Sequence, residues 1–187
     1  VRDDNRQAAP KTDVTKPFVL YISGIDTYGD VGEVSRSDVN MLAVMNPAKR
    51  TMLLVNTPRD YYVQLHGVAG MPDKLTHAGI YGIDMSRQTL GDLYGVEIPY
   101  YVRLNFTSLV KMVDVVGDIT VESDYAFHSF QAGKNTLDSK RTLEFARERY
   151  SFSDGDRQRG RNQQKVIEAI VAKMSEPRNL TRYNAIL

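Results

Sequence analysis

Two aspartates stand beside apolar runs that have the composition of β-strands. Asp26 follows Phe18–Ile25 directly, and Asp38 precedes Val39–Met45. Ligand crevices in α/β proteins form where strands end, so both carboxylates are expected at one edge of a sheet. Together they could hold a hard cation such as Mg²⁺, which takes few carboxylates plus substrate phosphates. The alternative is that Asp26 is an ordinary turn residue and that Asp38 pairs with Arg36.

Arginines gather at three further places and suggest an anion site. Arg59 ends the third apolar run, and Arg147 and Arg149 stand near the end of a predicted helix. Residues two apart on an ideal helix point about 200° apart, so this pair reaches one ligand only if the helix ends there. The next polar segment adds Arg157, Arg159 and Arg161. Converging guanidinium groups would suit a diphosphate. The alternative is a solvated charged face, with Arg147 and Arg149 complementing a helix dipole.

Three other polar side chains are weaker candidates. Gln163, on the first turn of the last predicted helix, could donate to a phosphate or orient an arginine, or could simply be exposed. Lys74 could bind an anion and His77 could act as a base, although a structural role is the more common one for such a histidine. The three histidines (His66, His77 and His128) are scattered and show no metal-binding spacing.

The elements that must position these residues alternate along the chain. Strands are predicted at 18–25, 39–45, 51–55, 100–104 and 119–121, with the second and third forming a hairpin. Helical character is predicted at 74–82, 85–94, 106–116, 139–149 and 162–174, with Asp138 capping the fourth helix and a polar loop at 151–160. This interleaving predicts an α/β or α+β fold, and we expect a central mixed sheet covered by helices.

Composition and net charge limit the kinds of protein that this chain could be. With 187 residues, 42% hydrophobic and 25% charged, the chain suits one globular domain. A net charge of +1 gives no global attraction to nucleic acid, and the absence of cysteine excludes disulfides and thiolate metal sites. No apolar run approaches the roughly 20 residues of a membrane helix. We expect residues 1–17 to be a linker or the tail of an upstream segment and 18–187 to be the domain, with a truncated C-terminus and a membrane anchor that has been removed.

Seven short motifs occur in an order and spacing that resemble the LytR-CpsA-Psr family. They are the Gly-Ile-Asp ending of 18–26, Arg36-Ser37-Asp38, Asn56–Asp60, Lys74–Ala78 with Tyr81-Gly82, Val113–Val121, Phe145–Tyr150, and Asp156–Arg157 with Arg161–Gln164. The resemblance runs from about Phe18 to Met174 and is closest to capsule-type CpsA members.

This resemblance implies a membrane-anchored phosphotransferase whose domain lies on the outer face of the cell. It would move a glycopolymer, of the capsular polysaccharide or teichoic acid type, from a polyprenyl-pyrophosphate carrier to peptidoglycan. It also implies an α-β-α sandwich with a long apolar pocket for the polyprenyl chain, and Mg²⁺ (or Mn²⁺) as cofactor.

The resemblance further assigns roles to individual residues. Asp26 and Asp38 match acidic residues near the head group and the metal, and either could be the catalytic base. The pyrophosphate-binding residues are matched by Arg59, Arg147, Arg149 and Gln163, with Lys74 as a further basic residue. The family's Asp-Arg-Gly-Arg is replaced by Asp156-Arg157-Gln158-Arg159, which leaves the register of Arg157 and Arg159 open.

Two other functions remain open. The same arginines would serve a non-catalytic module that senses polyprenyl phosphate or wall polymer. The segment from Arg147 to Arg161 could also serve a nucleic-acid binder or nuclease. The near-neutral net charge argues against that reading, as does the lack of aromatic residues interleaved among these arginines beyond Tyr150 and Phe152.

Overall fold

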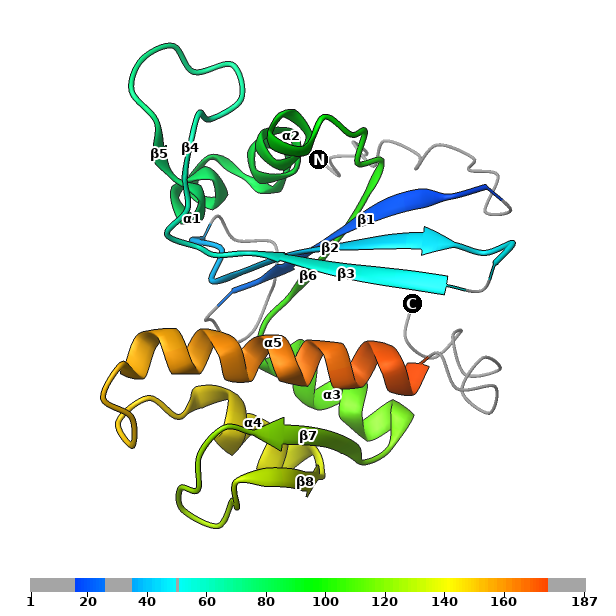
Figure 1. The fold of residues 1–187 in the computed structure, drawn as a ribbon, viewed down its shortest axis with the longest axis vertical. Helices are drawn as coiled ribbons and strands as arrows, with labels where there is room; N and C mark the ends of the chain where they lie inside the picture. Colours follow the sequence, from blue (N-terminus) through cyan, green and yellow to red (C-terminus); the bar gives the residue numbers. More distant parts are fainter. Residues whose placement is uncertain (1–15, 26–34, 50, 175–187) are drawn as a thin grey trace, which may run out of the picture.

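A central four-stranded sheet, in the order β3–β2–β1–β6, organises the fold (Figure 1). The computed structural model describes residues 16–25, 35–49 and 51–174. Strands β1 (Phe18–Gly24), β2 (Val39–Asn46) and β3 (Thr51–Thr57) are antiparallel neighbours, whereas β6 (Tyr100–Leu104) runs parallel to β1. The mixed sheet and the β2–β3 hairpin are therefore confirmed.

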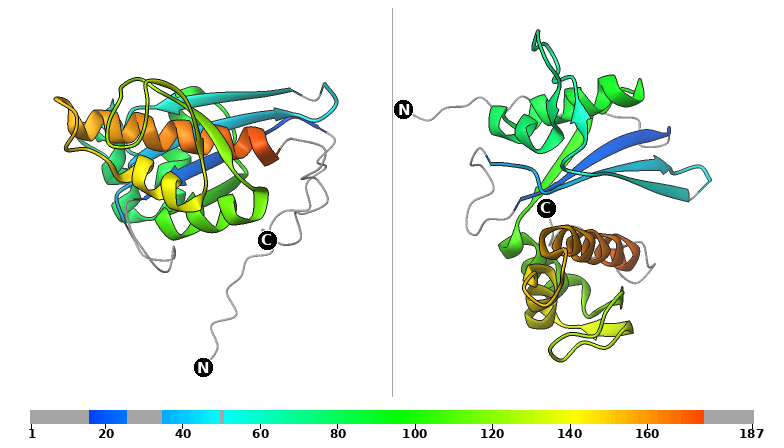
Figure 2. Two further views of the ribbon diagram at one scale, coloured as in Figure 1. Left: turned by 90° about the horizontal axis from the view of Figure 1, so that it is seen from below. Right: turned by 60° about the vertical axis from the view of Figure 1, so that its left-hand side comes forward.

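Helices cover both faces of this sheet (Figure 2). One face carries α1 (Leu75–Ala78), η1 (Gly79–Tyr81), α2 (Ile83–Tyr94) and the small pair β4 (Tyr62–Val63) and β5 (Asp73–Lys74). The other face carries α3 (Phe106–Val116) and α5 (Gly155–Met174), with α4 (Ser139–Arg147) and the hairpin β7 (Ile119–Ser123) and β8 (Gly133–Leu137) beyond them. The predicted α-β-α sandwich is confirmed.

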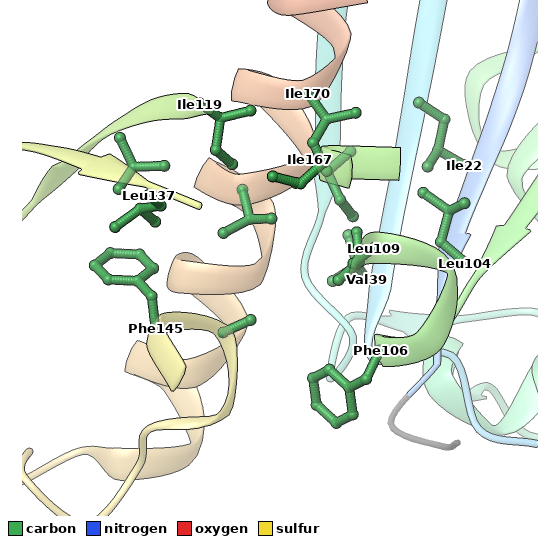
Figure 3. Packing of buried hydrophobic residues seen from close by; sticks show 14 of the residues in the cluster. Ile22, Val39, Leu104, Phe106, Leu109, Ile119, Leu137, Phe145, Ile167 and Ile170 are labelled. Carbon is green, nitrogen blue, oxygen red and sulfur yellow. The ribbon is translucent and has the colours of Figure 1, made fainter. Parts of the chain in front are cut away.

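The larger apolar core lies on the α3–α5 side of the sheet. Alternate residues of β2 face it (Val39, Met41 and Ala43), while Leu42 faces the smaller core under α1 and α2. In Figure 3, Ile167 and Ile170 of α5 lie between side chains of the sheet and those of α4, β7 and β8. Each fully buried side chain of this size contributes about 1.5–3 kcal/mol. Helix α5 therefore joins the outer hairpin layer to the sheet.

Polar caps fix two of the helices on this side. The Asn105 side chain accepts a hydrogen bond from the Ser108 backbone N–H (2.9 Å) at the start of α3. Asp138 does the same for the Arg141 N–H (2.7 Å) at the start of α4, as predicted from the sequence.

Several predicted boundaries were wrong. Helix α5 begins at Gly155, seven residues before the predicted Asn162, so the predicted loop contributes its first turns. Helix α4 ends at Arg147 and not at Arg149, and Lys74 lies in β5 and not in a helix. Strands β4, β5 and β8 were not predicted, because two are two residues long and the third, GKNTL, is largely polar.

Nowhere in the described ranges does a helix combine the length and the apolar character needed to span a bilayer.

Candidate functional site

The four strands of the central sheet bring their ends together at one edge. Asp38, just before β2, donates its backbone N–H to Gly24 O at the end of β1 (2.8 Å), and Ile25 N–H donates to Leu104 O at the end of β6 (2.8 Å). Strand β3 ends at Thr57, which pairs with Asn40 of β2. A Cβ atom on Gly24 would lie 2.8 Å from the Cβ of Val39, so only glycine allows this close approach. The end of β1 and the start of β2 therefore pack closely at this edge.

An ion pair between Asp38 and Arg59 stands at this edge. The Arg59 guanidinium donates to Asp38 Oδ1, and the two side chains are 31% and 11% exposed. Thr76 N–H donates to Arg59 O (2.9 Å), which ties the arginine's backbone to α1. The alternative partner weighed for Asp38, Arg36, is an exposed residue. The acidic and basic candidates at residues 38 and 59 are thus brought into direct contact.

A cavity of about 520 Å³ opens beside this ion pair, between the sheet edge and the N-terminal half of α5. Its size falls in the range of small-molecule sites. The sheet side contributes Asp38, Val39 and 56–61, and α5 contributes Arg157, Gly160, Arg161 and Gln164. Three guanidinium groups (Arg59, Arg157 and Arg161) face two carboxylates (Asp38 and Asp60), so the lining carries a formal excess of positive charge. Such a lining favours an anionic ligand.

The α5 side of the cavity is one face of the helix. Arg157, Arg161 and Gln164 are spaced i, i+4 and i+7, so their side chains share a face. Arg161 donates to Asp154 Oδ2 (2.6 Å) and to Gln158 Oε1 (2.8 Å), which orients its guanidinium. Arg161 was predicted only as one of three arginines of a polar loop, and Gln164 was not predicted as a site residue. Their shared face would have been evident had the helix been recognised from Gly155 onward.

Lys74 reaches the cavity wall indirectly, through Asp60. Its ammonium group donates to Asp60 Oδ1 (2.9 Å), and Asp60 also lies near Arg59. The hydrogen bond from Lys74 is the main reason that the pKa of Asp60 lies below its usual value, with Arg59 and Arg157 adding to the effect. Asp60 is therefore ionised at neutral pH, and Lys74 helps to neutralise this wall of the cavity.

Arg147 and Arg149 lie outside the lining, at the end of α4. The Arg147 guanidinium carbon lies 5.9 Å from the ring centre of Phe106, which begins α3 just beyond the end of β6, and Arg149 stacks on Tyr150 at 4.9 Å. The helix ends between the two arginines, because Glu148 is extended (φ −65°, ψ 131°). The condition set by the sequence for a shared ligand is therefore met.

The Glu148 side chain stabilises this extended segment through two hydrogen bonds. Its Oε2 accepts from His128 Nε2 (2.7 Å) and its Oε1 from the Ser151 backbone N–H (2.7 Å). His128 has a positive φ of 45°, which is uncommon for a residue other than glycine. Burial raises the pKa of Glu148, but the hydrogen bonds from His128 and Ser151 outweigh it, so that the net shift is downward. Sequence reasoning missed both Glu148 and His128.

Buried amides on α5 fix the last turn of α4. Asn162 Nδ2 donates to Phe145 O (3.3 Å) and Gln163 Nε2 to Ala146 O (3.4 Å). Such terminal carbonyls have no partner within their own helix. Gln163 is buried and lies in the middle of α5, so the interpretation as an exposed first-turn residue is wrong. The Gln163 amide holds the carbonyl of Ala146, one residue before Arg147, and so bears on Arg147 only through the backbone.

The remaining predicted residues are distributed as follows. Asp26 lies outside the described residues. Arg159 lies on α5 but does not line the cavity, because it points about 200° away from Arg157. His77 pairs with Asp73 (2.9 Å), which suits the structural role considered for it.

Replacing Glu148 with glutamine should lower the free energy of unfolding by about 1 kcal/mol at pH 7, a value kept small because His128 is 62% exposed. The pKa of Glu148 is lowered in the folded state, so its contribution is complete above the ordinary value of 4.5 and is lost as the pH falls through the folded pKa. The difference between wild type and variant should therefore shrink in urea unfolding at pH 4. Glu144→Gln is the control, because Glu144 is exposed on α4, and it should show little difference at either pH.

Three comparisons place these features among known proteins. The LytR_cpsA_psr family model matches residues 2–187. The Enterococcus faecalis protein named polyisoprenyl-teichoic acid–peptidoglycan teichoic acid transferase TagU is 36% identical over 179 residues, covering 92% of this chain and 58% of that protein. The chain spans about three fifths of the length of the curated relatives it matches.

Solved structures show the same likeness. The crystal structure of B. subtilis TagV matches with a TM-score of 0.77 and 28% identity, over 92% of this chain and 70% of that one. A structure of TagT bound to LI-WTA matches with a TM-score of 0.69 and 29% identity, over 86% of this chain and 65% of that one.

Proposed function

This chain belongs to the LytR-CpsA-Psr family, and from that premise we propose that it binds a polyprenyl-pyrophosphate-linked glycan and transfers the glycan to peptidoglycan. The observation that carries the proposal is the cavity in which Arg59, Arg157 and Arg161 stand beside Asp38. Guanidinium groups stay charged and grip phosphate oxygens with two parallel donors. Arg147 and Arg149, at the end of α4, would supply further donors.

The polyprenyl chain would occupy the apolar layer between the sheet and helices α3 and α5. Val39 supports this placement, because it both lines the cavity and belongs to the larger core. Partly buried methionines pack against the same core: Met45, Met52, Met112 and Met174. Methionine is flexible and suits surfaces that must adapt to a ligand. Apolar burial at roughly 25 cal/mol per Å² would then provide most of the affinity for the lipid.

The lining also fits a divalent cation held by few protein ligands. No cluster of three or more acidic or histidine side chains occurs within the described ranges, so a cage made wholly of protein is not offered there. Asp38 borders the cavity, and Mg²⁺ binds well to one or two carboxylates together with substrate phosphates. When bound, Mg²⁺ or Mn²⁺ would neutralise charge on the pyrophosphate. Asp38 would hold it, and Asp26 remains the second predicted ligand.

The reaction needs little covalent chemistry from the protein. An acceptor hydroxyl oxygen bonds to the glycan-side phosphorus, the bond from that phosphorus to the bridging oxygen breaks, and polyprenyl phosphate leaves. The arginines stabilise the charge that develops on the leaving phosphate. An aspartate takes the proton of the hydroxyl, with Asp38 and Asp26 both candidates. Water in place of the acceptor would give the pyrophosphatase side reaction.

The relatives' names favour a teichoic acid as the glycopolymer, whereas the sequence motifs favour a capsular polysaccharide, and we propose the broader class that includes both. Substrates of this kind would require the domain to act at the outer face of the membrane, and we propose that it is membrane-anchored there. A non-catalytic sensor of the same lipid would show binding without turnover.

Arg147→Ala should weaken binding of a long-chain polyprenyl pyrophosphate about tenfold, because one charge-assisted contact of about 1.4 kcal/mol is lost. Native mass spectrometry of the protein titrated with the lipid would measure it. Arg141→Ala is the matched control, since Arg141 lies on the same helix but stacks on Phe130 and donates to Thr136 O. Equal binding by wild type and Arg147→Ala would count against the proposed site. Binding without glycan release in the presence of Mg²⁺ and peptidoglycan would identify a sensor.

A further inference from the structure

The peptide group that joins Ser37 to Asp38 is held at both of its polar ends. The Asp38 N–H donates to Gly24 O (2.8 Å), and the Ser37 carbonyl accepts from Asn40 Nδ2 (3.3 Å). A peptide group is planar, so fixing its N–H and its C=O fixes the plane from which the Asp38 side chain departs. The orientation of the peptide group from which the Asp38 side chain departs thus depends on Asn40.

Asn40 is itself oriented by a second buried side chain. The Tyr21 hydroxyl donates to Asn40 Oδ1 (2.6 Å), and both residues are fully buried. An amide oxygen only accepts and an amide nitrogen only donates. With its oxygen engaged by Tyr21, the Asn40 amide must direct Nδ2 toward Ser37 O. If the Asn40 amide were flipped, its Nδ2 would face the Tyr21 hydroxyl proton, unless that hydroxyl turned away. Its Oδ1 would then face the Ser37 carbonyl oxygen, and neither oxygen can donate.

Tyr21 is protonated at neutral pH and is fixed in the smaller core. Burial raises the pKa of the Tyr21 hydroxyl above its ordinary value, so it remains a donor. Its ring packs in the smaller core with Leu42, Leu75 and Leu90, on the face of the sheet that α1 and α2 cover. With no exposed surface, Tyr21 and Asn40 cannot touch a substrate, so any effect they have on it must be indirect.

We propose that Tyr21 and Asn40 are positioning residues that set the direction of the Asp38 carboxylate from behind the sheet edge. The catalytic part of this inference rests on the proposed function of Asp38. A purely structural hydrogen bond would change stability alone, whereas a positioning chain must also change the freedom of the Asp38 peptide group and the turnover that depends on it.

The test compares Tyr21→Phe and Asn40→Asp with Thr89→Val. The first two remove one donor each while keeping side-chain shape. Thr89 is a fully buried hydroxyl on α2, in the same layer, that accepts from the His66 N–H (3.1 Å) and is not part of the chain of bonds. Amide hydrogen exchange followed by NMR reports on the Asp38 N–H without requiring any activity. We expect exchange at Asp38 to rise about tenfold in Tyr21→Phe and Asn40→Asp relative to Thr89→Val, with exchange at Leu42 changing equally in all three.

Steady-state turnover of a lipid-linked glycan gives the second measurement. We expect kcat to fall about tenfold in both variants with KM for the lipid unchanged, since the loss is confined to the transition state. Exchange at Asp38 that matches Thr89→Val overturns the inference, and so does a kcat that matches Thr89→Val. A wild-type protein without turnover would refute the proposed function instead, and the exchange measurement would still decide whether Tyr21 and Asn40 fix the Asp38 backbone.

Discussion

Asp38→Asn is expected to lower glycan transfer from the lipid carrier by about 10²- to 10⁴-fold, the range found for loss of a positioned acid or base. The substitution keeps the shape of the side chain but removes the charge that pairs with Arg59. It therefore removes a proton acceptor and the proposed cation ligand together. Single-turnover release of polyprenyl phosphate would measure the loss directly.

Binding and a matched control separate chemistry from folding in this variant. Lipid binding should remain, because Arg59, Arg157 and Arg161 still line the cavity. Asp84→Asn is the control, since Asp84 is 70% exposed on α2 and pairs with Arg87. Transfer by Asp38→Asn within about twofold of wild type, well below the 10²-fold loss expected of a catalytic base, would remove Asp38 from the chemistry and leave Asp26 as the remaining candidate base.

The sheet could be predicted because its strands carry their own signal. Strands β1, β2 and β3 are rich in apolar and β-branched residues, with β1 and β2 largely buried and β3 only partly so. A short turn joins β2 and β3 into a hairpin. Asp38 and Arg59 flank these strands, so a correct sheet predicts their shared edge. Their direct contact is a property of side-chain direction, which spacing does not specify.

The start of α5 escaped prediction because its buried side is polar. Gln158 and Asn162 occupy the inward positions where a hydrophobic stripe is normally sought, and both are fully buried. Gln158 satisfies its amide with Asp124 and Asn162, both at 3.0 Å. Hydrophobic periodicity detects only apolar faces. The cavity face of α5 was therefore hidden, although Arg157 and Arg161 were visible in the sequence.

The end of α4 lies between Arg147 and Arg149. The sequence requires the helix to end between Arg147 and Arg149 if both are to reach one ligand, and the structure ends it there. Residues distant in the sequence hold this helix end. His128 bonds to Glu148, and the buried amides of Asn162 and Gln163 bond to the last carbonyls of α4. Contacts between residues far apart in the sequence leave no local pattern in that sequence.

Phe145→Ala should cost about 3–5 kcal/mol of stability, a large part of the roughly 5–15 kcal/mol that holds a domain together. Phe145 is fully buried, with its ring centre 5.5 Å from that of Phe127 and 5.3 Å from that of Phe130. Truncation leaves a cavity that these two rings can only partly fill.

The same substitution should also affect the anion site, because the Phe145 carbonyl receives the Asn162 amide two residues before Arg147. Urea unfolding followed by fluorescence would give the loss, and Phe145→Leu, which keeps more of the volume, should lose less if the alanine variant does not fold. Tyr150→Ala is the control on the same segment, since Tyr150 is 86% exposed and its truncation should change stability by no more than about 0.5 kcal/mol. If Phe145→Ala loses no more stability than Tyr150→Ala, then the aromatic cluster does not hold the end of α4. The arginines would then owe their placement to the amides of α5 and to Glu148 alone.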